Sequence, residues 1–134
     1  MTYIIAMPAL AIVIAAYMVV GASGGMMLDA DVYAMTLASG ASFALRLGDL
    51  FVIAGLAALF VEMIKAGRAG RSTVADHMLS TLVFVAAIVC FLLVDVAGTS
   101  TFLILTLMAL IDVVAGFSIS ILTARRDFSI GGDA

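Results

Sequence analysis

An apolar stretch from Thr99 to Arg126 is the feature that most constrains how this chain can fold. An α-helix rises ~1.5 Å per residue, so about 20 apolar residues match the ~30 Å hydrocarbon core of a bilayer. The stretch is long enough to cross a membrane, and Asp112, near its middle, is the one charged residue between Thr99 and Thr123. The stretch therefore predicts a membrane-spanning helix with a carboxylate near the middle of the bilayer.

The composition of the whole chain agrees with this prediction. Hydrophobic residues make up 66% of the 134 residues and charged residues 11%, whereas soluble domains are about 45–50% apolar and ~25% charged. We expect a single membrane domain over residues 1–134, with the lipid bilayer as its surroundings. Six basic residues and a net charge of −3 give no basic surface for nucleic acid. The one cysteine, Cys90, lies in an apolar run and is interpreted as a buried small hydrophobe.

The apolar runs and their breaks predict an all-α fold, an integral membrane bundle of four transmembrane helices. Thr73 and Asp76 have the spacing of a capping box before the third run. Gly98 ends that run, and Thr99 offers an N-cap for the next helix. The expected helices cover about 2–22, 42–66, 74–97 and 100–124.

The first expected helix could also be a cleaved signal peptide, because small residues follow it at 21–25. A signal peptide has a basic n-region and a shorter apolar run, which favours a retained helix here. Gly21 and Gly25 have the spacing that lets two membrane helices approach closely. Because the run is dense in glycine and precedes a polar connection, helix termination is the favoured role.

The distribution of charge predicts the topology. The connections expected at one end of the bundle contain Asp29, Asp31 and Asp95 and no basic residue. Cytoplasmic segments of membrane proteins carry an excess of Lys and Arg. Both termini and the 66–77 loop are therefore expected in the cytoplasm. The basic residues expected at that side are Lys65, Arg68, Arg71, Arg125 and Arg126.

The second expected helix contains most of the other charged candidates. Gly48, Gly55 and Glu62, with Ala41 before them, recur every seven residues, which predicts a packing face turned into the bundle. Arg46 and Asp49 lie three residues apart near one end of that helix, at a depth similar to Asp95 of the third helix. Pairing among these three charges would serve either as an ion network that sets helix register or as a ligand or ion site.

Asp112 raises the sharpest chemical question. On a helix, Leu105, Met108, Ala109 and Gly116 share its face, which we expect to point into the bundle. Asp112 could form an interhelical hydrogen bond, or it could handle a proton or a ligand. Proton transfer needs a chain of ionisable or hydrated groups, and the first and third helices offer no ionisable group at that depth.

No motif indicates catalysis, a metal or a cofactor. His77 is interpreted as an interfacial residue, since no second His or Cys has ligand spacing with it. The sequence contains no P-loop, no G-x-S-x-G and no H-E-x-x-H. We expect a non-enzymatic protein, and an enzyme acting on lipid or quinone is the least supported alternative.

Three segments carry a resemblance: FALRLGDLFVIAGLAALFVEMIKAGR, ADHMLSTLVFV and TSTFLILTLMALIDVVAGFSISILTARRDFSI. Together they resemble an uncharacterised group of small four-helix integral membrane proteins of proteobacteria, chiefly alphaproteobacteria. The resemblance covers about 43–130 and implies a bacterial inner membrane. It implies no activity and no catalytic or binding residue.

Two functions are expected from these patterns. The first is an accessory or scaffold subunit that packs with other membrane protein subunits of a larger inner-membrane complex, or a homo-oligomer. The alternative is a proton, ion or small-solute channel or transporter component that uses Asp112, with Arg46, Asp49 and Glu62 as further polar lining.

Overall fold

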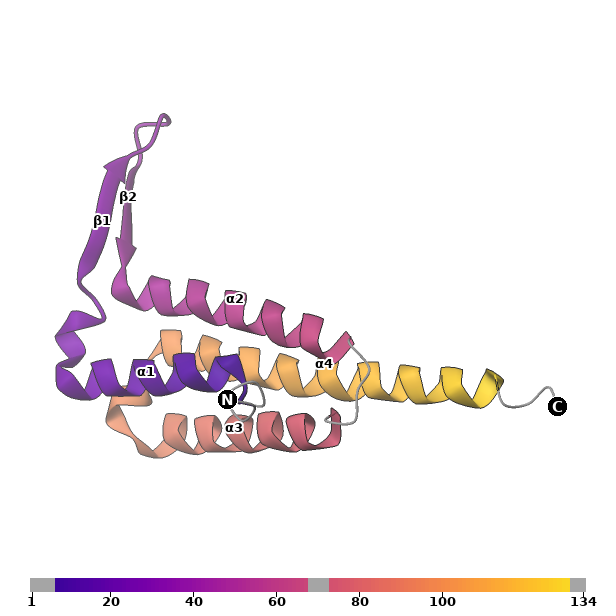
Figure 1. Cartoon of the computed structure of the whole chain (residues 1–134). Helices are drawn as coiled ribbons and strands as arrows, with labels where there is room; N and C mark the ends of the chain where they lie inside the picture. Colours follow the sequence, from indigo (N-terminus) through magenta and orange to yellow (C-terminus); the bar gives the residue numbers. More distant parts are fainter. Residues whose placement is uncertain (1–6, 68–72, 131–134) are drawn as a thin grey trace.

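The computed structural model describes residues 7–67 and 73–130 of the chain. This part is mostly helical, and its four α-helices run antiparallel in chain order (Figure 1). The elements are α1 Ala9–Ser23, η2 Gly25–Met27, β1 Asp31–Thr36, β2 Ser42–Arg46, α2 Leu47–Gly67, α3 Thr73–Leu93, η3 Asp95–Ala97 and α4 Ser100–Ile130. Helices α1 and α3 end at one end of the bundle, which we call the hairpin end. Helix α2 ends and α3 begins at the other end, which we call the loop end.

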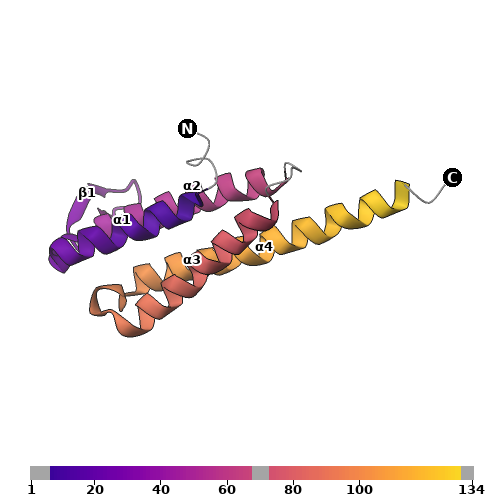
Figure 2. The same cartoon turned by 60° about the horizontal axis from the view of Figure 1, so that its bottom comes forward.

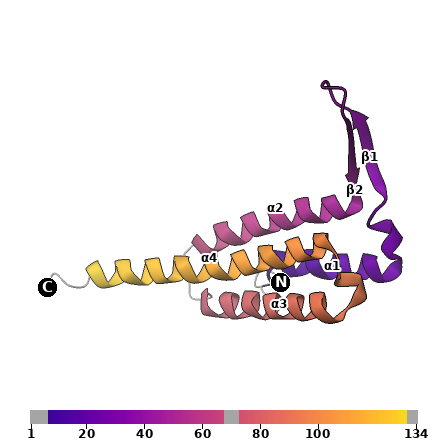
Figure 3. The same ribbon diagram turned by 180° about the vertical axis from the view of Figure 1, so that it is seen from behind.

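Helix α4 is the central element of the bundle. It packs against both α2 and α3 and also contacts α1, while α1 packs mainly on α2. Figure 2 shows α1 beside α2 and α3 crossing α4 at an angle. With 31 residues, α4 is about 46 Å long, and its C-terminal part extends beyond α2 and α3 at the loop end (Figure 3).

Within the described residues, three helical segments are long and apolar enough to cross a membrane: Leu47–Gly67, Ala75–Leu93 and Ser100–Leu122. Helix α1 is apolar but has only 15 residues. It begins directly after Pro8, whereas the first helix was expected to begin near residue 2. Residues 1–6 lie outside the described part of the chain.

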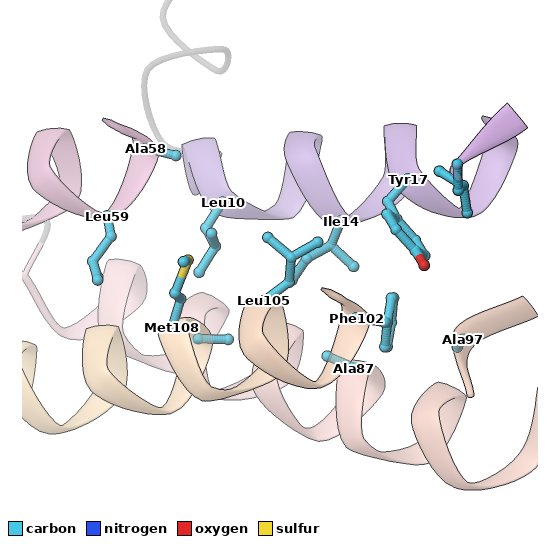
Figure 4. Close-up of a cluster of buried hydrophobic side chains, with 12 residues drawn as sticks. Leu10, Ile14, Tyr17, Ala58, Leu59, Ala87, Ala97, Phe102, Leu105 and Met108 are labelled. Carbon is cyan, nitrogen blue, oxygen red and sulfur yellow. The ribbon is translucent and has the colours of Figure 1, made fainter. Parts of the chain in front are cut away.

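The core lies where α1 and α4 meet, toward the hairpin end (Figure 4). Tyr17 of α1 is fully buried, and its ring contacts Phe51 at 5.3 Å and Phe102 at 5.4 Å between centroids. The Tyr17 hydroxyl lies 2.6 Å from Oγ1 of Thr99, which also accepts a hydrogen bond from the Phe102 backbone N–H at 3.1 Å. Thr99 therefore caps α4, as the sequence predicts, and links it to α1.

Glycine allows α2 and α4 to approach closely. A Cβ atom at Gly55 would lie 2.6 Å from Cδ2 of Leu105 and 2.9 Å from Sδ of Met108. At Gly48 it would lie 3.1 Å from Oγ1 of Thr101. The expected packing face of α2 is confirmed for Gly48, Gly55 and Glu62, all of which are buried. Ala41 is exposed and lies outside the helix.

The all-α prediction is wrong for the connection between α1 and α2, and so is the helix start at residue 42. Residues 42–46 form β2, which pairs antiparallel with β1, and α2 begins at Leu47. A tight turn produces the hairpin, since Leu37 donates a backbone hydrogen bond to Ala41 at 2.9 Å and Gly40 adopts a φ of +83°. Aromatic Tyr33 and Phe43 favour extended backbone.

The third expected helix also ends earlier than predicted. Helix α3 stops at Leu93, and the short η3 turn at Asp95–Ala97 leads into α4. The backbone of Val94 is extended, with φ −117° and ψ 118°, which breaks the helix before Gly98 is reached. Helices α3 and α4 nevertheless form the antiparallel pair that the sequence predicts.

The link between α1 and α4 predicts a measurable effect of one hydroxyl group. Tyr17→Phe should lower the free energy of unfolding by about 0.5–1.5 kcal/mol, because it leaves Thr99 without the Tyr17 partner. Titration with a denaturing detergent would measure the change. Tyr33→Phe is the matched control, since Tyr33 is exposed on the hairpin. Equal unfolding midpoints for both variants would contradict the role of this hydrogen bond.

Candidate functional site

Asp112 lies near the middle of α4 and is buried, with 8% of its surface exposed. Its expected neighbours on the same helix face, Leu105, Met108, Ala109 and Gly116, are buried as well. The carboxylate accepts a hydrogen bond from the hydroxyl of Ser80 on α3. The predicted inward face of α4 is confirmed, and the partner of Asp112 is a hydroxyl group on the neighbouring helix.

His77 lies one turn before Ser80 on α3. Its Nε2 is hydrogen-bonded to Oγ of Ser120 on α4, and its ring is 5.6 Å from the ring of Phe117. A Cβ atom at Gly116 would lie 2.5 Å from Nδ1 of His77. Gly116 therefore provides the space that the imidazole occupies between the two helices.

Glu62 of α2 is buried and connects two helices. Its Oε1 accepts a hydrogen bond of 2.6 Å from the backbone N–H of Ala9, the first residue of α1. Its two carboxylate oxygens each accept a hydrogen bond of 3.1 Å from Nζ of Lys65, one turn further on. A carboxylate at a helix N-terminus is favoured by the helix dipole. Glu62 thus holds the start of α1 against α2.

These groups form one region, which we call the inner polar cluster. Asp112 lies within electrostatic range of Glu62, His77 and Lys65. Charges interact more strongly in an apolar environment than in water, so groups on α2 and α3 contribute to the electrostatic surroundings of Asp112 on α4. The inner polar cluster extends from the middle of α4 toward the loop end and consists of Glu62, Lys65, His77, Ser80, Asp112 and Ser120.

The expected cluster of Arg46, Asp49 and Asp95 is not formed. Within residues 7–67 and 73–130, the ion pair of Arg46 is with Asp31, its Nε lying 3.7 Å from Oδ1 of Asp31. Asp49 accepts a hydrogen bond of 2.9 Å from the backbone N–H of Arg46, at the start of α2. Since residues 42–46 are a strand, Arg46 is not one helical turn from Asp49, and the predicted pairing is lost.

Asp95 lies in η3 at the hairpin end. It lines a pocket of about 230 Å³ together with Asp29 and with polar and apolar groups of α1 and α4. Both carboxylates are exposed, so this pocket differs from the buried environment of Asp112. Its remaining lining residues are Tyr17, Gly25, Leu28, Val96, Thr99, Ser100 and Thr101.

Ser80 and Ser120 are the site residues that the sequence prediction misses, and His77 is closer to Asp112 than expected. The spacing contains a signal for them. His77 and Ser80 are three residues apart on α3, and Asp112, Gly116 and Ser120 follow one another at intervals of four on α4. Each set therefore occupies one helix face.

In the described part of the chain, no group of three His, Cys, Asp or Glu side chains is placed to hold a metal ion.

The contact between Gly116 and His77 predicts strong coupling between these positions. Gly116→Ala should destabilise the protein by about 1–3 kcal/mol, because the added methyl group displaces the imidazole. In a His77→Ala background the same change should cost much less. A double-mutant cycle in unfolding free energy measures this difference. Additive effects of the two substitutions would show that Gly116 does not provide space for His77.

Comparison with known proteins finds no protein-family model, no curated protein and no solved structure that matches this chain. The chemistry of the inner polar cluster is therefore inferred from its own contacts.

Proposed function

We propose that this chain is a non-enzymatic integral membrane protein that acts as an accessory or scaffold subunit. In this proposal its helices cross a bacterial inner membrane and pack with other membrane subunits of a larger complex, or with copies of the same chain. Three helices of sufficient length and apolar character support the membrane location. The resemblance to small four-helix membrane proteins of proteobacteria supports the inner membrane.

The proposed orientation places the loop end in the cytoplasm. Lys65 lies at that end, and Arg68 and Arg71, which lie outside the described residues, follow it in the sequence. The hairpin end does contain one basic residue, Arg46, because the strand β2 carries it out of the bundle. It is paired with Asp31, so the excess of basic residues still favours a cytoplasmic loop end.

The exposed face of α3 is the observation that carries the scaffold proposal. Among the described side chains of α3, only Ser80 and Ala87 are buried. An exposed stripe repeats at alternating intervals of four and three, the spacing with which helices pack knobs into holes. This α3 stripe consists of Met78, Leu82, Val85, Val89 and Leu92. In this proposal, a helix of a partner subunit packs along this stripe.

Cross-linking in native membranes tests this proposal. In a Cys90→Ala background, Val85→Cys on the α3 stripe should form one product of defined mass with a thiol-reactive cross-linker. Leu56→Cys on the exposed side of α2 is the comparison position, and a product from Val85→Cys that Leu56→Cys does not form would assign the contact to α3. The mass distinguishes a second copy from a foreign subunit. The proposal fails if neither variant is cross-linked and the protein leaves the membrane as a monomer.

A second candidate function is supported by the inner polar cluster. One region between three helices contains two carboxylates and an imidazole. These are the carboxylates of Asp112 on α4 and Glu62 on α2 and the imidazole of His77 on α3. Hydroxyl groups can both donate and accept hydrogen bonds, so Ser80 and Ser120 can connect ionisable groups. This arrangement suits a subunit that passes protons or cations between Asp112 and the cytoplasmic side.

Flux measurements in liposomes separate the two functions. If Asp112 handles protons, Asp112→Asn should abolish proton flux while the unfolding midpoint changes little, because Asn keeps the shape and can still pair with Ser80. Ser118→Ala is a control, since Ser118 is exposed and its hydroxyl donates to the carbonyl of Val114 on the same helix. Flux that is unaffected by Asp112→Asn would exclude the transport function.

A further inference from the structure

The β1–β2 hairpin projects from the hairpin end of the bundle across the direction of the helices (Figures 1 and 3). Backbone hydrogen bonds hold the base of the hairpin to the bundle. Leu47 donates a hydrogen bond of 3.0 Å to the carbonyl of Ala30, and Gly48 donates one of 2.9 Å to Leu28. The hairpin is thus fixed to the first turn of α2, where the apolar span begins.

The two faces of the hairpin differ in size and polarity. Side chains alternate between the faces of a strand, and directly paired residues share a face. The register pairs Tyr33 with Leu45 and Met35 with Phe43, which places four large apolar side chains on one face. We call this the large face. The paired residues of the opposite face are Ala34 with Ala44 and Thr36 with Ser42, and Val32 lies at the irregularity in the register between Asp31 and Tyr33.

We propose that the hairpin lies in the membrane–water interface, with its large face inserted among the lipid headgroups and upper acyl chains. This inference rests on the proposed membrane-spanning arrangement of the helices. If the helices cross the bilayer, strands that run across their direction lie along its surface. The start of α2 at Leu47 then places the base of the hairpin at the edge of the hydrocarbon core.

The composition of the hairpin fits this depth. Tyr33 is 55% exposed, and tyrosine is enriched at membrane interfaces, where its ring is apolar and its hydroxyl is hydrated. Met35 and Phe43 are exposed as well. At the base, the Arg46–Asp31 pair has side chains that are 60% and 56% exposed, and such charges are tolerated among headgroups but are costly in hydrocarbon.

Backbone hydrogen bonding limits how deep the hairpin can lie. A sheet of two strands has an unpaired edge on each side, and these groups need water because hydrocarbon offers no partner. The headgroup region still contains water. An isolated two-stranded hairpin is marginally stable in water, so contact of the large face with lipid also explains how the hairpin keeps its form.

The direction of the large face is indicated by Leu45. Of all residues in β1 and β2, Leu45 alone is not exposed, and it belongs to the large face. Leu45 is partly buried next to α2, which indicates that the large face is directed toward the helices. If the helices cross the bilayer, the large face is then directed toward the bilayer.

Fluorescence quenching at neighbouring positions tests the proposal. In a Cys90→Ala background, an environment-sensitive dye would be attached at Phe43→Cys on the large face and at Ala44→Cys on the opposite face. The protein would be placed in vesicles containing lipids with a nitroxide near the headgroup. We expect strong quenching and blue-shifted emission at position 43, and little of either at position 44. Met35→Cys and Thr36→Cys repeat the comparison on the other strand.

A dye at Leu56→Cys distinguishes failure of the interfacial hairpin from failure of the membrane-spanning bundle. Leu56 is 54% exposed near the middle of α2, so a nitroxide deep in the acyl chains should quench it. If position 56 is quenched but positions 43 and 44 respond alike, the interfacial hairpin is wrong and the membrane-spanning bundle stands. If position 56 is not quenched, both proposals fail. A dye at position 43 that is shielded from lipid and from aqueous quenchers would indicate a protein partner and overturn the lipid contact.

Discussion

The close approach of α2 to α4 is the interaction on which the rest of the structure depends. Close approach of two helices increases the van der Waals contact between them, and helices placed in lipid as proposed would associate mainly through such contact. Gly55 allows this contact by leaving room for Leu105 and Met108. Because α4 then contacts every other helix, its position against α2 sets where α1 and α3 lie. The buried ring of Tyr17 and the cap at Thr99 follow from that placement.

The same packing explains why polar groups are collected on one half of the bundle. Gly116 admits the imidazole of His77 between α3 and α4, which aligns Ser80 with Asp112. Glu62 is retained in the interior because Lys65 and the first backbone N–H of α1 both donate to it. A buried carboxylate is tolerated only with such partners. The inner polar cluster is therefore a set of interhelical links, and the proposal of proton movement rests on the same groups.

The two ends of the bundle differ in chemistry. The loop end combines the inner polar cluster with the long C-terminal part of α4, whereas the hairpin end has exposed carboxylates and a strand pair with an apolar face. If the helices cross a bilayer as proposed, this asymmetry gives the chain a defined direction in it. The proposed contacts of the α3 stripe and of the hairpin use different elements, so both can form at once.

Local patterns in the sequence were sufficient for the apolar middle parts of α2, α3 and α4, for the inward face of Asp112 and for the cap at Thr99, because apolar length, helical period and capping are properties of neighbouring residues. They were wrong for the start of α2, for the end of α3 and for the end of α4, which continues to Ile130 and not only to about 124. The tertiary structure decided the rest. Residues 42–46 form a strand because they pair with 31–36, and that pairing moves Arg46 from Asp49 to Asp31. The partner of Asp112 depends on how α3 is rotated about its axis against α4. Glu62 accepts a hydrogen bond from the backbone N–H of Ala9, and a backbone donor cannot be recognised from the residue type. Contacts between distant segments require the fold to bring them together, so no single stretch of sequence contains them.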